Sequence, residues 1–166
     1  MNCKHALGKI DSYSNNAHDI PVKEIHMHIV EINTDSEILA ARDVMRQLRP
    51  GVPSDDYLAT VRRMMVAGYR QVVLIEEGSV RAVAGFRIFE MLYAGGQILY
   101  VDDLNTDERV RSSGYGHALL DWLKAEAREK GCVQLHLDSG VQREGAHRFY
   151  FREKLSVNCF HFRVVL

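Results

Sequence analysis

Two consecutive carboxylates and a turn that carries two glycines lie close together in the chain. Asp102 and Asp103 follow an apolar run at residues 98–101, and the segment 111–116 reads Arg-Ser-Ser-Gly-Tyr-Gly. A positioned carboxylate can remove a proton from a reacting group as a general base. Glycines at the start of a helix let backbone N–H groups approach an anion, and the helix dipole adds positive charge there. Proton transfer and phosphate binding are therefore the chemistries to consider.

The glycine-bearing turn matches one phosphate-binding motif better than two others. A P-loop ends in Gly-Lys-Ser/Thr, whereas Gly116 precedes His117. The dinucleotide motif G-x-G-x-x-G requires a third glycine where Leu119 stands. The pattern Arg/Gln-x-x-Gly-x-Gly/Ala is matched by Arg111, Gly114 and Gly116. Taken alone, this short motif leaves an ordinary strand-to-helix turn as an equal alternative.

The elements that would position these residues follow from apolar spacing and from capping signals. A strand of residues 97–106 runs into the turn, and a helix of residues 114–130 follows. The pattern predicts the order β-α-α-β-β-β-α-β-α-β and one mixed sheet flanked by helices, an α/β (α+β) fold. The other expected strands are residues 24–32, 69–76, 80–90, 132–138 and 158–166, and the other helices begin near residues 35, 54 and 142 and end near 48, 68 and 153.

Composition excludes several classes of function. The chain has 166 residues, is 46% hydrophobic and carries a formal net charge of -1, which fits one compact domain without a basic, nucleic-acid-binding stripe. No apolar run is long enough to span a membrane. The cysteines, Cys3, Cys132 and Cys159, are odd in number and far apart, which favours reduced thiols in the cytoplasm. Of the eight histidines, His26 and His28 alternate on an expected strand and the others are scattered without a second ligand pair, so we predict no metal site. We expect a poorly ordered leader at residues 1–22 and a single domain at residues 23–166.

A second motif gives the turn a family context. The segment 146–150, Ala-His-Arg-Phe-Tyr, resembles the Ala-x-x-Phe/Leu-Tyr segment of the GCN5-related N-acetyltransferase (GNAT) family, and the turn resembles that family's acyl-CoA pyrophosphate loop. Both motifs fall in the right order on the expected elements, and the resemblance covers residues 24–165. Arg143 stands where many members have asparagine, and Lys154-Leu155 replaces Gly-Phe. The resemblance implies the acyl-CoA N-acyltransferase fold, with a mostly antiparallel twisted sheet.

The resemblance also implies a reaction, the direct transfer of an acetyl group from acetyl-CoA to an amine of a small molecule or a protein. Tyr150 would be the general acid for the departing thiolate. Asp102 is our preferred base, directly or through water, and Asp103 is the alternative base or a substrate-binding charge. Strand alternation allows at most one of them to face the amine directly. A solvated strand end and a core aromatic remain the alternatives for these three residues. The predicted cofactor-binding residues are Leu104, Asn105, Thr106, Arg111, Ser112, Ser113, Gly114, Tyr115, Gly116 and Ser139.

Other readings of the function remain open at this stage. A module of the same fold that senses acyl-CoA or a metabolite without turnover is the main alternative, and a dinucleotide-dependent enzyme is a third. Dimers are common in the family, so a homodimer is possible. In the segments that would build the acceptor pocket, the charged residues have mixed signs and select no substrate; they are Arg46, Arg49, Asp55, Asp56 and Glu90.

Overall fold

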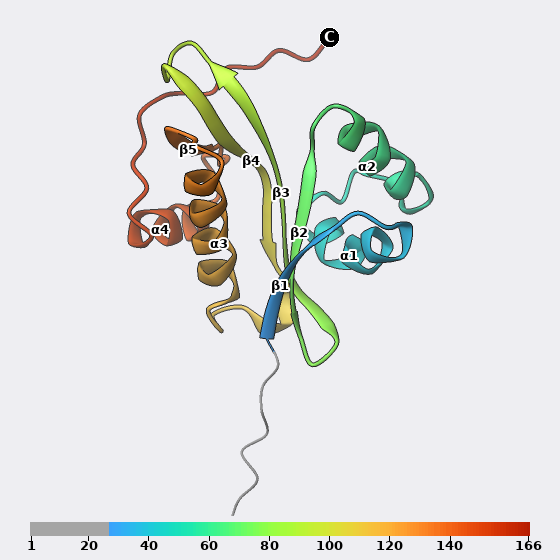
Figure 1. The fold of residues 1–166 in the computed structure, drawn as a ribbon. Helices are drawn as coiled ribbons and strands as arrows, with labels where there is room; N and C mark the ends of the chain where they lie inside the picture. The colour runs from blue at the N-terminus through green and yellow to red at the C-terminus, as the bar shows by residue number, and fades with distance from the viewer. Residues whose placement is uncertain (1–26) are drawn as a thin grey trace, which may run out of the picture.

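The described part of the chain forms one five-stranded sheet with helices on both faces (Figure 1). The computed structural model describes residues 27–166, so the expected leader and the first residues of the expected first strand lie outside the described residues. The strand order is β1-β2-β3-β4-β5. Only the β4–β5 pair is parallel. The predicted fold class, a single mixed and mostly antiparallel sheet flanked by helices, is confirmed.

The observed elements follow the expected order up to the last helix. The strands are β1 (Met27–Ile32), β2 (Arg70–Glu76), β3 (Ser79–Met91), β4 (Gly96–Thr106) and β5 (Gln134–Leu137). The helices are α1 (Asp35–Leu48), α2 (Tyr57–Val66), α3 (Tyr115–Glu129) and α4 (Glu144–Arg152), with short 3-10 turns η1 (Ser54–Asp56) and η2 (Glu108–Val110). The segment around Ser54 therefore forms a separate turn rather than the first turn of α2.

Local capping explains where α1 begins. The Thr34 hydroxyl accepts a hydrogen bond from the Glu37 N–H, and Glu37 Oε2 accepts one from the Thr34 N–H at 2.9 Å. This reciprocal pair satisfies two N–H groups that would otherwise lack partners at the helix start. Ile38, Ala41 and Met45 then lie on the buried face of α1, as their spacing predicts.

The helices divide the core into two layers. In Figure 1, α1 and α2 cover one face of the sheet, and α3 and α4 lie on the other. On the α3 face, Leu119 and Leu123 pack with Phe86 and Val101 of the sheet. On the α1–α2 face, Ile38 and Val61 pack with Val73 and Val83. Because both faces are covered, the central strands β2 and β3 contain nearly continuous apolar runs.

A β-bulge interrupts β4 at the acidic pair. Asp103 is paired with Gly85 and Val101 with Phe86, so Asp102 is an additional residue without a register partner on β3. Val101 and Leu104 both belong to the core on the α3 face, whereas strict alternation would place them on opposite faces. The bulge therefore shifts the side-chain alternation of β4 by one residue between these two positions.

The prediction of a last strand at residues 158–166 is wrong. The chain has no regular element after α4, and Phe160, Phe162 and Val164 are exposed. The segment has the alternation of a strand, but a strand forms only where a neighbouring backbone completes its hydrogen bonds. The adjacent edge strand β5 offers four residues, and its one ladder is with β4. His161 Nδ1 lies 2.9 Å from Asp138 Oδ2, which brings the tail beside the residue that follows β5.

Candidate active site

A groove of about 1480 Å³ runs along the α3–α4 face, beside the end of β4. It collects most of the predicted cofactor residues, which come from β4, from α3 and from the loop between them. The Asn105 side chain is turned away, because its Nδ2 donates to the Val44 carbonyl of α1 at 2.8 Å. The groove lining does not include Ser113 or Ser139. The predicted residues that line it are Leu104, Asn105, Thr106, Arg111, Ser112, Gly114, Tyr115 and Gly116.

The start of α3 provides free backbone donors at the groove. Gly114 is the N-cap residue, has a φ of +86° and gives the helix no side-chain cap. The first-turn N–H groups therefore keep their capacity for an anion. At Gly116, a Cβ would lie 3.3 Å from Thr106 Oγ1 and 3.6 Å from Phe149 Cζ. Gly116 therefore lets α3 pack closely against Thr106 and Phe149, and the open space around Gly114 leaves room for an anion, so the site fits the pyrophosphate that the motif predicts.

The charge of the groove also suits a phosphate-bearing ligand. Its lining contains six Lys or Arg residues and three Asp or Glu residues. The basic residues come from the loop before α3, from α3 itself and from α4, so they are gathered by the fold and form no stripe in the sequence. Such an excess of positive charge attracts anions and raises their local concentration.

A buried carboxylate holds the turn between β4 and α3. Asp107 is fully buried and caps η2, where its side chain accepts from the Arg109 backbone N–H at 3.1 Å. Its carboxylate also accepts from Arg109 Nε at 3.0 Å and from Gln47 Nε2 of α1 at 3.3 Å. Hydrogen bonds from Arg109 hold the pKa of Asp107 well below its usual range. Asp107 thus links α1 to the turn that leads into the groove.

Tyr150 lies on α4 in the wall of the groove. Its ring packs edge-on against Phe149, with 5.4 Å between the ring centroids. Burial raises the pKa of the Tyr150 hydroxyl above its ordinary value, so the group stays protonated at neutral pH. The side chain is therefore both a packed aromatic and a hydroxyl donor that borders the groove.

A second and smaller cavity, of about 230 Å³, lies on the opposite face of the sheet. It is formed between α1, α2 and the central strands, and both Asp102 and Asp103 line it. The expectation that only one of the two carboxylates can face this side is wrong, because the bulge in β4 suspends the alternation. Both carboxylates of the acidic pair therefore border this cavity.

The two carboxylates have different surroundings. Asp103 is buried and accepts from the Tyr69 hydroxyl at 2.8 Å through Oδ2 and from Arg49 Nε at 2.6 Å through Oδ1. Asp102 Oδ2 lies 3.2 Å from Arg87 Nε. Burial raises the pKa of Asp102, with Arg87 opposing and Asp103 reinforcing the rise. The Asp102 carboxyl therefore keeps its proton to a higher pH than an ordinary aspartate.

The cavity contains residues for which the sequence offered no specific signal. Tyr69 fits because Gly85 stands opposite, where a Cβ would lie 1.9 Å from the tyrosine oxygen. Gln71 is fully buried, and its Nε2 donates to the Tyr57 hydroxyl at 3.2 Å. Of the charged residues at the expected acceptor pocket, only Arg49 lines the cavity. In the sequence, Gln71 is a polar residue directly before the apolar run 72–75 of β2, a pattern that does not by itself indicate a buried site.

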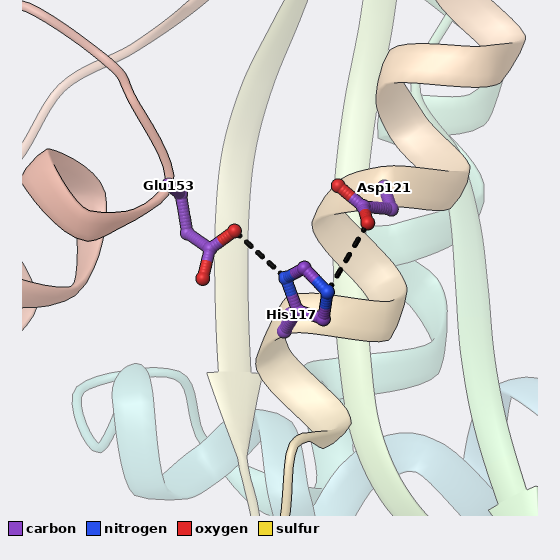
Figure 2. A group of neighbouring side chains, drawn as sticks. All are labelled: His117, Asp121 and Glu153. Carbon is purple, nitrogen blue, oxygen red and sulfur yellow. Dashed lines mark hydrogen bonds and ion pairs between the residues drawn. The ribbon is translucent and has the colours of Figure 1, made fainter.

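One cluster in the groove has the composition of a metal site. His117 and Asp121 of α3 and Glu153 after α4 point toward one another in Figure 2, with ligand atoms within 4.8 Å. His117 Nδ1 lies 2.7 Å from Glu153 Oε2, and His117 Nε2 lies 3.3 Å from Asp121 Oδ2. Lys124 Nζ, 3.1 Å from Asp121 Oδ1, already supplies positive charge here. We interpret the cluster as an ion-pair network that ties α3 to α4.

The fold and the two cavities together suit an acyltransferase, with a groove rich in basic residues on one side of β4 and an acidic pocket on the other. Residues 40–155 match the Acetyltransferase (GNAT) family. The chain belongs to this family and is an acetyltransferase. No helix in residues 27–166 has the length and apolar character needed to cross a membrane.

Individual relatives agree with this assignment. The chain is 31% identical to the uncharacterized N-acetyltransferase YhdJ of Bacillus subtilis, over 75% of this chain and 87% of that protein. It is 28% identical to the aminoalkylphosphonate N-acetyltransferase of Salmonella typhimurium, over 55% of this chain and 60% of that protein. Among solved structures, the aminoglycoside N-acetyltransferase AAC(6')-Iy in complex with CoA has a TM-score of 0.75 at 17% identity, covering 86% of this chain and 97% of that one.

Proposed function

We propose that the protein is an acetyl-CoA-dependent N-acetyltransferase that modifies the amine of a small molecule. The observation that carries the proposal is the bulge in β4, because it directs Asp102 and Asp103 to one cavity while Leu104 and Thr106 border the groove on the other face. Donor and acceptor would then approach the same strand from opposite sides. The relative that is named as an aminoalkylphosphonate N-acetyltransferase and the structural neighbours named as aminoglycoside acetyltransferases are both named for small amines.

The proposed reaction needs one base and one acid. When bound, acetyl-CoA supplies the thioester carbonyl and the thiolate leaving group. Asp102 accepts the proton of the acceptor ammonium, directly or through water, and the free amine nitrogen forms the new N–C bond as the C–S bond breaks. The Tyr150 hydroxyl gives its proton to the sulfur, and the second proton, which the nitrogen loses as the amide forms, restores the hydroxyl through water. The proton on Asp102 passes to solvent, so the products are the amide, CoA and one proton. A primary amine has a pKa of about 10.4, so deprotonation at pH 7 costs roughly 4.6 kcal/mol, and a positioned base offsets part of that cost.

Calorimetric titration tests the cofactor, and a thiol-release assay tests the transfer. We expect acetyl-CoA to bind at micromolar concentration, whereas NAD and ATP bind much more weakly. Amine acetylation should then release CoA at a rate that Tyr150→Phe lowers without weakening acetyl-CoA binding. Tight acetyl-CoA binding without transfer to any amine would favour a sensing module, and absence of acetyl-CoA binding would refute the proposal.

A further inference from the structure

The charges around the acceptor cavity are balanced before any ligand enters. Two carboxylates, Asp102 and Asp103, meet two guanidinium groups, Arg49 and Arg87, within hydrogen-bond or ion-pair distance. An acceptor that brings one ammonium adds one positive charge to this set. Each further positive charge is repelled by the arginines, whereas one acidic group on the acceptor restores the balance. The cavity therefore disfavours polycations.

Arg49 has the right position and donors for such an acidic group. It is the C-cap residue of α1 and lines the cavity, with 51% of its side chain exposed. Its Nε donates to Asp103, and a terminal nitrogen donates to the Asp102 carbonyl at 2.8 Å. A guanidinium carries five N–H donors in a rigid fork, so donors remain for a carboxylate or phosphonate. The contacts to the acidic pair hold the fork beside the amine-binding carboxylates.

The acceptor cavity also offers a neutral hydrogen-bond donor, and its volume limits the size of the acceptor. The Tyr57 hydroxyl accepts from Gln71 Nε2, so its own proton is available to another acceptor. Burial raises the pKa of Tyr57, which keeps that proton in place. A cavity of about 230 Å³ is smaller than the roughly 300–1,000 Å³ of sites for drug-sized ligands. Its acceptor should therefore be a compact molecule.

We propose that the acceptor is a small amine that also carries one acidic group, with the amine at Asp102 and the acidic group at Arg49. This inference deepens and rests on the proposed acetyl transfer. It makes Arg49 a specificity-determining residue, since the guanidinium binds the acidic group and takes no part in the bond changes. Carboxylate and phosphonate share the chemistry that the fork recognises.

Four amines test the charge preference. β-Alanine and propylamine have the same number of carbon atoms but differ in the acidic group, 2-aminoethylphosphonate replaces the carboxylate, and spermidine is a polycation. We expect kcat/KM for at least one of the acidic amines to exceed that for propylamine and spermidine by about tenfold or more. A preference for spermidine or propylamine would overturn the inference.

Variants of Arg49 test the assignment. Arg49→Gln should lower the preference for the acidic amine over propylamine by about ten- to a hundredfold, mainly through KM. Arg49→Lys keeps the positive charge without the planar guanidinium, so it should lower this preference by less. It also tests the assignment if Arg49→Gln folds poorly. Arg46→Gln removes the same charge from the same helix outside both cavities, and it should leave the preference unchanged. An equal loss with all amines in both Arg49 variants would show a structural role and refute the assignment.

A binding measurement separates this inference from the proposed function. β-Alanine and 2-aminoethylphosphonate are titrated into protein saturated with CoA, which has no acetyl group to transfer. Binding of either that weakens in both Arg49 variants would support recognition of the acidic group even if no amine were acetylated. Failure of both to bind would overturn the inference, whatever acetyl-CoA does.

Discussion

The groove that we propose for the cofactor and the cavity that we propose for the acceptor lie on opposite faces of β4, and they are built in different ways. The groove presents backbone N–H groups at the start of α3, in a turn that a short stretch of sequence encodes. The cavity presents side chains that α1, β2 and β4 bring together from distant parts of the chain, such as Arg49, Tyr69 and Asp103. Local sequence therefore specifies the first site, and tertiary contacts specify the second. Substitutions on the two sides should separate chemistry from cofactor binding.

The largest effect is expected on the cavity side. Asp102→Asn removes the proposed base and should lower kcat by about 10²–10⁴-fold. Because the pKa of Asp102 is raised, the wild-type kcat/KM should increase with pH as the carboxyl ionises, and the variant should lack this ionisation. A pH-rate profile, with acetyl-CoA affinity measured in parallel, checks this.

Asp103→Asn is the matched comparison for this prediction. Both oxygens of Asp103 are engaged by Tyr69 and Arg49, so its substitution should retain the ionisation of Asp102 in the pH-rate profile. If the ionisation disappears in Asp103→Asn and persists in Asp102→Asn, the roles of the two carboxylates must be exchanged.

On the groove side, a negative charge at the start of α3 should weaken cofactor binding. Gly114→Asp places a carboxylate beside the expected pyrophosphate and should weaken acetyl-CoA binding by about a hundredfold, or roughly 2.7 kcal/mol. Gly131→Asp is a close control, because Gly131 also has a positive φ, of +72°, with open space around it, at the other end of α3. Calorimetry should show near-normal affinity in this control. Equal losses in the two variants would mean that backbone strain, and not phosphate binding, explains the effect.

This contrast also explains what the sequence could predict. The motif residues Arg111, Gly114 and Gly116 line the groove because residues adjacent in sequence stay adjacent in a tight turn. The orientation of Asp102 and Asp103 could not be predicted. A bulge depends on how β3 pairs with β4, and the alternation of residue types along β4 does not reveal it. Residues 158–166 show the opposite error, because alternation predicts a strand whether or not a partner strand is present.

A smaller effect is expected at the turn that joins the two sides. Asp107→Asn loses the charge in the hydrogen bonds to Arg109 and should cost about 2 kcal/mol in the free energy of unfolding. The pKa of Asp107 is depressed in the folded state, so its contribution is complete above the unfolded pKa of about 3.9 and is lost as pH falls below that value. The free energy of unfolding, measured with denaturant, should therefore fall between about pH 5 and pH 2, and it should fall by more in the wild type than in the variant. If the free energy of unfolding had the same pH dependence in both proteins, Asp107 would not be the cause of the loss of stability.

The smallest effect is expected after α4, where the chain departs from the family pattern. Lys154 has a φ of +64°, and the Leu155 N–H donates to the Tyr150 carbonyl at 2.9 Å, so α4 ends in a left-handed C-terminal cap. A side chain is strained in this conformation, and the glycine that many members carry here would relieve it. Lys154→Gly should therefore stabilise the protein by about 0.5–1 kcal/mol in thermal or denaturant unfolding. Arg152→Gly, inside the same helix, should destabilise it by a similar amount. If both variants shifted the free energy of unfolding in the same direction, the left-handed cap would not be the cause. Opposite shifts would show that Lys154, where many family members have glycine, lowers the stability of the helix that lines the groove.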